Sequence, residues 1–179
     1  MQVVDRKSRM HKGATHAIPG HPRRQGYGGI EPRLATAPAF VSVGYQERDI
    51  DEFVQLLVDA DVEILVDVRL NAISRKRGFS KTALSNALAQ ADIVYRHERD
   101  LGNPKDNREP FRQGLPSARE RYLAHISNGA SGIYEEVVAL ASEKRVALLC
   151  FEREHAECHR SCIIDTAQNS DPSLRVLKI

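Results

Sequence analysis

Residues 146–151 read VALLCF, an uninterrupted run of apolar side chains between Arg145 and Glu152. A strand with one face in water alternates apolar and polar residues, whereas a continuous run is typical of a strand covered on both faces. Such strands occur in parallel sheets that carry helices on either side. This stretch therefore predicts an α/β domain.

Strand and helix patterns alternate along the chain around this run. Short apolar runs predict further strands at residues 40–44, 63–68, 92–95 and 174–179. Helical spacing predicts helices at residues 49–59, 80–91, 133–142 and 158–168, and another that begins near residue 117. We therefore expect a three-layer α/β sandwich with a mostly parallel sheet of about five strands and right-handed crossovers.

Two helix starts carry the capping-box pattern, in which a residue at the N-cap is followed three positions later by glutamate. Asp49 precedes Glu52 in this way, and Ser117 precedes Glu120. Between the predicted elements, residues 96–116 form a stretch longer than the ~12–15 residues beyond which loops without secondary structure tend to be functional. We expect this loop to overhang a site.

Charge divides the chain of 179 residues into two parts. Residues 1–37 hold seven lysines or arginines against two acidic residues and show no apolar periodicity, so we expect a flexible basic N-terminal extension. Residues 38–179 should form a single α/β domain. The extension either neutralises nucleic-acid phosphates or has no function.

No apolar run reaches the ~18–20 residues that span a bilayer, and residues 1–20 lack the apolar core of a secretory signal. We therefore expect a cytoplasmic protein with no membrane partner. The three cysteines, Cys150, Cys158 and Cys162, are odd in number and lie in one short stretch, so we expect thiols rather than disulfides. The sequence leaves the oligomeric state open.

Polar residues follow the predicted strand at residues 63–68. Asp67 and Arg69 lie two apart and so share one face of an extended chain, where they either bond to each other or converge on a ligand. Ser74 and Arg75 follow in the next loop. Because the planar guanidinium group suits phosphate and carboxylate, these residues are candidates for anion binding.

Tyr95 ends the next predicted strand and His97 follows it, and both are candidate substrate-binding residues. With Glu98 beside it, the imidazole of His97 could exchange protons near neutral pH. A histidine in a loop is often only solvated, and this second interpretation stays open.

The strongest cluster follows residues 146–151. Cys150 and Glu152 end this strand, and Cys158, His159 and Arg160 come shortly after it. If Cys158 begins a helix, the helix dipole and Arg160 would favour an anion there or lower the pKa of the thiol. The segment is therefore either a phosphate cradle or a reactive thiolate, unless its thiols are buried and inert.

A zinc site is the competing interpretation, because Cys150, Cys158, His159 and Cys162 are soft ligands. Familiar structural zinc sites use pairs such as C-x2-C, which this spacing does not match. The sequence therefore predicts neither a metal nor a cofactor.

Five motifs in this order resemble the domain of unknown function 488 family over residues 40–168. They are Ser42-Val43-Gly44-Tyr45; Asp67-Val68-Arg69 with Ser74-Arg75; Tyr95-x-His97-Glu98 with Leu101-Gly102-Asn103-Pro104; Leu149-Cys150-Phe151-Glu152; and Cys158-His159-Arg160. The resemblance implies a compact α/β domain with these motifs around one cleft, and it implies no particular reaction.

The favoured hypothesis is an enzyme that acts on a phosphate-bearing small molecule, a nucleotide or a nucleic-acid end. The anion would be held by Arg69, Arg75 and Arg160. Asp67 and Glu152 would orient these arginines or act as the base. Cys158 or His159 would act as the nucleophile or proton carrier. The alternative is a noncatalytic nucleic-acid or nucleotide binding module.

Overall fold

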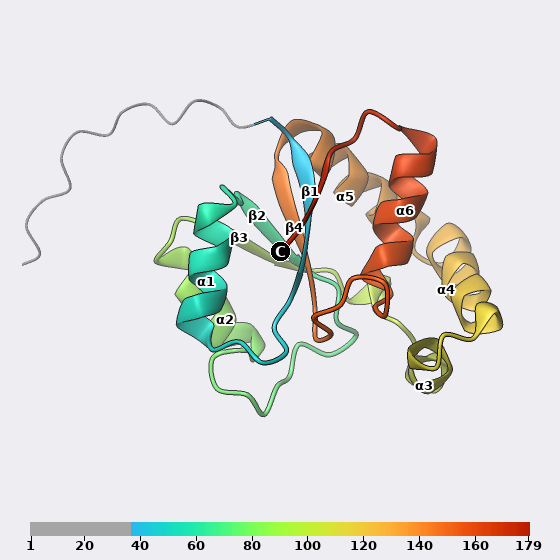
Figure 1. Cartoon of the computed structure of the whole chain (residues 1–179), viewed down its shortest axis with the longest axis horizontal. Coiled ribbons are helices and arrows are strands. Elements are labelled where there is room, and N and C mark those ends of the chain that lie inside the picture. The colour runs from blue at the N-terminus through green and yellow to red at the C-terminus, as the bar shows by residue number, and fades with distance from the viewer. Residues whose placement is uncertain (1–36) are drawn as a thin grey trace, which may run out of the picture. The chain divides into compact units, whose positions relative to one another are not determined.

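The computed structural model describes residues 37–179 (Figure 1). Its strands are β1 (Ala39–Gly44), β2 (Ile64–Asp67), β3 (Val94–His97), β4 (Arg145–Cys150) and β5 (Val176–Lys178). They form one sheet in the order β3-β2-β4-β1-β5, and every neighbouring pair is parallel. The predicted α/β class is confirmed, and the sheet is parallel throughout. The predicted extension over residues 1–37 lies outside the described residues except for Ala37.

The strand order determines which face of the sheet each helix covers. From β1 to β3 the chain moves toward one edge through α1 (Ile50–Asp59) and α2 (Lys81–Ala89). It then returns through α4 (Pro116–Asn128) and α5 (Ser131–Glu143) to β4, and through α6 (Arg160–Ser170) to β5. Because right-handed crossovers that run in opposite directions lie on opposite faces, the two groups of helices form the outer layers (Figure 1).

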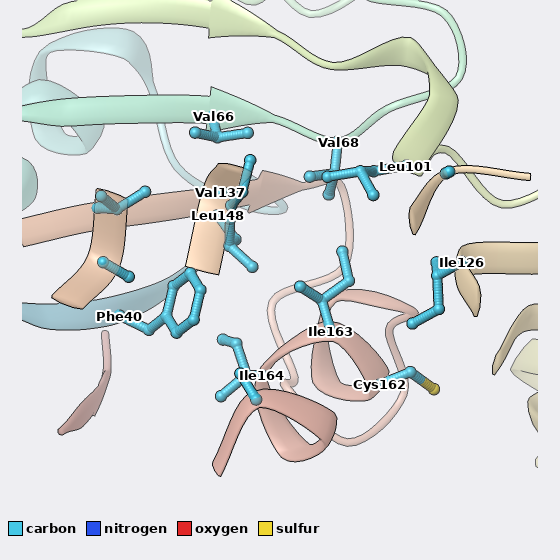
Figure 2. Packing of buried hydrophobic residues seen from close by; sticks show 14 of the residues in the cluster. Phe40, Val66, Val68, Leu101, Ile126, Val137, Leu148, Cys162, Ile163 and Ile164 are labelled. Atoms are coloured by element: carbon cyan, nitrogen blue, oxygen red, sulfur yellow. The ribbon is translucent and has the colours of Figure 1, made fainter. Parts of the chain in front are cut away.

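Two apolar cores fill the spaces between these layers. The first packs the sheet against α4, α5 and α6 through residues that include Phe40, Val66, Leu148, Ile126, Val137, Ile163 and Ile164 (Figure 2). The second packs the other face against α1 and α2 through Val41, Leu65, Leu149, Phe53, Leu57, Leu84 and Leu88. Alternate residues of β1, β2 and β4 thus enter different cores, as expected for strands covered on both faces.

Among residues 37–179, no helix combines the length and apolar character needed to cross a membrane.

One of the two predicted capping boxes is confirmed. Asp49 accepts the amide of Glu52 at 2.9 Å, and the Glu52 carboxylate accepts the amide of Asp49 at 3.2 Å. The second capping box is wrong, because α4 begins one residue before Ser117, at Pro116. Proline fits the first position of a helix, where its missing N–H costs nothing.

The chain after α2 differs from the prediction in two ways. The strand predicted at residues 92–95 is β3, shifted by two residues, because Asp92 has a left-handed φ of 57° and the amide of Ile93 donates to Leu88. The loop predicted at residues 96–116 contains three short helices: η1 (Arg99–Leu101), η2 (Lys105–Asn107) and α3 (Arg108–Arg112). Helices of three to five residues are too short to show periodicity in a sequence.

Candidate functional site

A cavity of about 180 Å³ lies where β2 and β4 end. These strands are neighbours, but the segments that follow them run to opposite edges of the sheet, an arrangement that leaves a crevice at the carboxyl ends. The lining comes from residues after β1, β2 and β4, from α3 and from the turn before α6. It consists of Tyr45, Arg69, Leu70, Asn71, Ile73, Asn103, Arg108, Phe111, Arg112, Cys150, Phe151, Glu152, Glu157, Cys158 and His159.

Asp67 and Arg69 form a buried ion pair on one side of this crevice. Arg69 Nε donates to Asp67 Oδ1 at 2.8 Å, and Arg69 Nη2 donates to Asp67 Oδ2. Tyr95 adds its hydroxyl, which donates to Asp67 Oδ2 at 2.7 Å. Of the two alternatives left open by their spacing, the structure therefore has Asp67 and Arg69 bonded to each other.

The remaining bonds of Arg69 fix its orientation. Its Nη1 donates to the carbonyl of Phe79 at 2.9 Å and to the hydroxyl of Tyr45 at 3.2 Å. Burial acts to lower the pKa of Arg69, but Asp67 outweighs burial, and the net shift is upward. Burial and the neighbouring Asp67 raise the pKa of Tyr95. Asp67 thus holds a permanently charged guanidinium at the cavity wall and does not itself line the cavity.

Five of the six predicted binding residues lie outside the cavity lining: Ser74, Arg75, Tyr95, His97 and Arg160. Ser74 Oγ accepts the amide of Lys76 at 3.1 Å, and Arg75 is exposed. His97 Nε2 lies 2.9 Å from the carbonyl oxygen of Arg69. Ser74 and His97 therefore make bonds that shape the loop after β2.

On the other side of the crevice, Cys150, Cys158 and His159 converge. His159 Nδ1 lies 3.7 Å from each of the two sulfur atoms, and its Nε2 lies 3.0 Å from the carbonyl oxygen of Val68. Their potential ligand atoms lie within 4.8 Å of one another. All three cysteines are free, as expected, but Cys162 belongs to the apolar core and is not part of this group.

The turn that carries Cys158 precedes the last helix rather than beginning it. The predicted helix start is wrong, because α6 begins at Arg160 and has His159 as its N-cap. The amides of Ser161 and Cys162 donate to the carbonyls of Cys158 and His159, at 2.9 and 3.0 Å. These amides close the first turn and are not directed at an anion beside Cys158.

Glu152 connects the thiols to the mouth of the cavity. Cys150 Sγ donates to Glu152 Oε2 at 3.0 Å, and Arg112 Nε lies 3.8 Å from Glu152 Oε1. Burial acts to raise the pKa of Glu152, but the hydrogen bonds from Cys150 and from backbone amides prevail and lower it. A hydrogen bond with Cys158, together with burial, raises the pKa of Cys150. The carboxylate is therefore ionised beside a protonated thiol.

Arg160 is fully buried and does not line the cavity. Its three nitrogens donate to the hydroxyl of Ser42 at 2.7 Å, to the carbonyl of Glu152 at 2.6 Å and to the carbonyl of Arg153 at 2.8 Å. The arginine thus fixes the backbone after β4 against β1. Gly44 makes this contact possible, since a Cβ there would lie 1.9 Å from the carbonyl oxygen of Glu152.

Two arginines that line the cavity were not predicted as site residues. Arg108 and Arg112 belong to α3, within the segment that we expected to overhang a site. Asn107 anchors that segment, since its Nδ2 donates to Asn103 Oδ1 at 3.0 Å and to the carbonyl of Ala118 at 2.9 Å. The length of the loop and its charge-rich composition were the signals available for these arginines.

Residues 49–167 match the family described as Domain of unknown function DUF488. The chain belongs to the DUF488 family. This match confirms the resemblance drawn from the five motifs, and it covers α1 through most of α6. No curated protein and no solved structure matches the DUF488 chain. Because the family description specifies no reaction, the chemistry has to be inferred from the cavity.

Proposed function

We propose that this DUF488 domain is an enzyme that acts on a phosphate-bearing small molecule, a nucleotide or a nucleic-acid end. One observation carries the proposal: the arginines of α3 line the same cavity as Glu152, Cys158 and His159. Anion-binding groups and groups able to exchange a proton or form a bond thus border one space, as an active site requires.

Arg108 provides the clearest anion-binding group. It is partly buried, its Nε donates to the carbonyl of Asn103 at 3.2 Å, and it has no acidic partner among the described residues. The side chain of Arg112 is 57% exposed and forms ion pairs with Glu109 at 3.3 Å and with Glu152 at 3.8 Å. Guanidinium groups bind phosphate oxygens in bidentate pairs, so these two side chains fit a phosphate group.

The size of the cavity favours a single anionic group within it and the remainder of the ligand outside. At about 180 Å³ it is smaller than the ~300–1,000 Å³ typical of whole-ligand pockets. Two lining residues are apolar and accessible: Ile73 is 80% exposed and Phe151 45%. An aromatic face of this kind can stack on a nucleobase, which supports a nucleotide or a nucleic-acid end over free phosphate.

We assign the proton transfer to Glu152 and the contact with the reacting centre to the cluster of Cys150, Cys158 and His159. The ionised carboxylate of Glu152 can accept a proton. Asp67 and Arg160 are positioning residues in this scheme, because each holds another part of the site and neither lines the cavity.

A ligand panel tests the proposal. The full chain is mixed with inorganic phosphate, nucleotides and 5′-phosphorylated oligonucleotides, and both the melting temperature and the chemical products are measured. Arg108→Gln and Arg112→Gln should each weaken binding by about 10- to 100-fold, the effect of losing a charged hydrogen-bonding group. Arg121→Gln is the matched control, because Arg121 lies outside the cavity lining and pairs with Asp106.

Three outcomes separate the hypotheses. Binding with turnover, weakened in both α3 variants, supports the enzyme. Tight binding without any product would support the noncatalytic binding module instead. Absence of a shift with every phosphate compound, or equal shifts in all variants, would overturn the phosphate assignment.

A further inference from the structure

We propose that Cys150, Cys158 and His159 bind a zinc ion, with the fourth coordination position open to the cavity. The three side chains come from the end of β4 and from the turn before α6, and all three line the cavity. Two thiolates and one imidazole are a ligand set that zinc accepts, and three protein ligands are the number found in catalytic zinc sites.

The orientation of His159 is the first argument. Its Nε2 lies 3.0 Å from the carbonyl oxygen of Val68, and a carbonyl can only accept, so Nε2 carries the proton. In the neutral ring Nδ1 is then the free lone pair, and it lies 3.7 Å from both sulfur atoms. Metal-binding histidines characteristically donate their second ring nitrogen to a carbonyl or carboxylate in this way.

The distances between the ligand atoms are the second argument. Zinc bonds of about 2.3 Å to sulfur and about 2.1 Å to nitrogen place tetrahedral ligands about 3.6 Å apart. The two observed Nδ1···Sγ separations are both 3.7 Å. An ion between the three atoms could therefore bond to Nδ1 and to both sulfurs.

The surroundings of the three side chains are the third argument. All three are buried, so a bound ion would be shielded from bulk water on the protein side. On binding, each thiol gives up its proton to solvent and the two thiolates neutralise the ion. Glu152, 3.0 Å from Cys150 Sγ, can accept one of these protons first.

An open fourth position would accept a water molecule or a phosphate oxygen. Binding of a phosphate oxygen there rests on the proposed function, because it needs an anion held by Arg108 and Arg112. Zinc binding itself does not depend on that function, since it is measured without substrate. The two proposals can therefore fail separately.

Metal titration of the full chain tests the site. The protein is stripped with a chelator under reducing conditions, dialysed against Zn²⁺ or Co²⁺, and analysed for metal content and for the visible absorption of thiolate-bound tetrahedral Co²⁺. Cys150→Ala, Cys158→Ala and His159→Gln each remove one ligand. Cys162→Ala is the matched control, because Cys162 is a buried thiol of the apolar core.

The expected result is one ion per chain, a thiolate charge-transfer band with Co²⁺, and at least about 100-fold weaker binding in each ligand variant. Cys162→Ala should bind as the wild type does. Circular dichroism shows which variants are folded. If a variant does not fold, the titration of the wild-type chain decides whether the protein binds zinc. A wild-type chain that binds no stoichiometric metal, or a folded Cys158→Ala variant with unchanged affinity, would overturn the zinc site, and the cluster would then be hydrogen-bonded thiols.

Discussion

Replacing Arg160 by methionine should strongly destabilise the domain, because this guanidinium joins two strand ends from a fully buried position. Its donor bonds, 2.6 to 2.8 Å long, reach one hydroxyl and two carbonyls. Charged hydrogen bonds contribute about 1.5–3 kcal/mol each, and a buried acceptor left without a donor costs about 1–3 kcal/mol. Water can reach part of the exposed segment around Arg153, so the three losses will not add fully.

We therefore expect Arg160→Met to lower the free energy of unfolding by about 3–5 kcal/mol. For a chain of this length that corresponds to a fall in melting temperature of roughly 6–20 °C. Arg160→Lys keeps the charge but cannot reach three acceptors with one ammonium group, so it should lose a substantial part of the same stability.

Urea denaturation followed by circular dichroism measures these changes. The control is Arg121→Met, which removes an exposed ion pair with Asp106 and should leave the free energy of unfolding nearly unchanged. If Arg160→Met proves as stable as Arg121→Met, the buried guanidinium does not hold the strand ends together, and the assignment of Arg160 as a positioning residue is refuted.

Three further changes probe other parts of the account. Asp67→Asn should lower the free energy of unfolding by about 3–5 kcal/mol, measured by urea denaturation, because it leaves the guanidinium of Arg69 buried without its carboxylate. Gly44→Ala should destabilise the domain and weaken phosphate binding, measured by calorimetry, because the new methyl group would displace the backbone of Glu152. Burial and nearby cations lower the pKa of His155, so the unfolded chain takes up a proton more readily than the folded chain below about pH 6.5. Stability should therefore fall as the pH drops below about 6.5, and His155→Gln should reduce that fall; equal pH dependence in the two proteins would contradict this assignment.

The fold could be predicted from the sequence because its strongest signals are local. The run at residues 146–151 and the capping box at Asp49 and Glu52 each depend on neighbouring residues, and both appear as expected. Boundaries were less predictable where tertiary contacts decide them. The start of β3 depends on the turn after α2, in which the amide of Ile93 donates to the carbonyl of Leu88. The start of α6 depends on the turn before it, in which the amide of Ser161 donates to the carbonyl of Cys158.

The site was predictable in its location but not in the use of each side chain. Asp67 and Cys150 end the neighbouring strands β2 and β4, and strand order places them at the same edge of the sheet. Cys158 follows β4 in the segment that leads to α6. Sequence spacing cannot show that Arg160 donates all its hydrogen bonds to one hydroxyl and two backbone carbonyls. Nor can it show that α3 brings Arg108 to the cavity. Both facts depend on contacts between residues far apart in the chain.

Crystals grown with tungstate, a heavy analogue of phosphate, would test most directly whether the arginines of α3 and the cluster of Cys150, Cys158 and His159 bind one ligand. We predict an anomalous peak that places tungstate in the cavity. The anion should be bonded to Arg108 and Arg112 and lie beside Cys158 and His159. A cavity without tungsten in crystals that bind the anion elsewhere would contradict a shared active site.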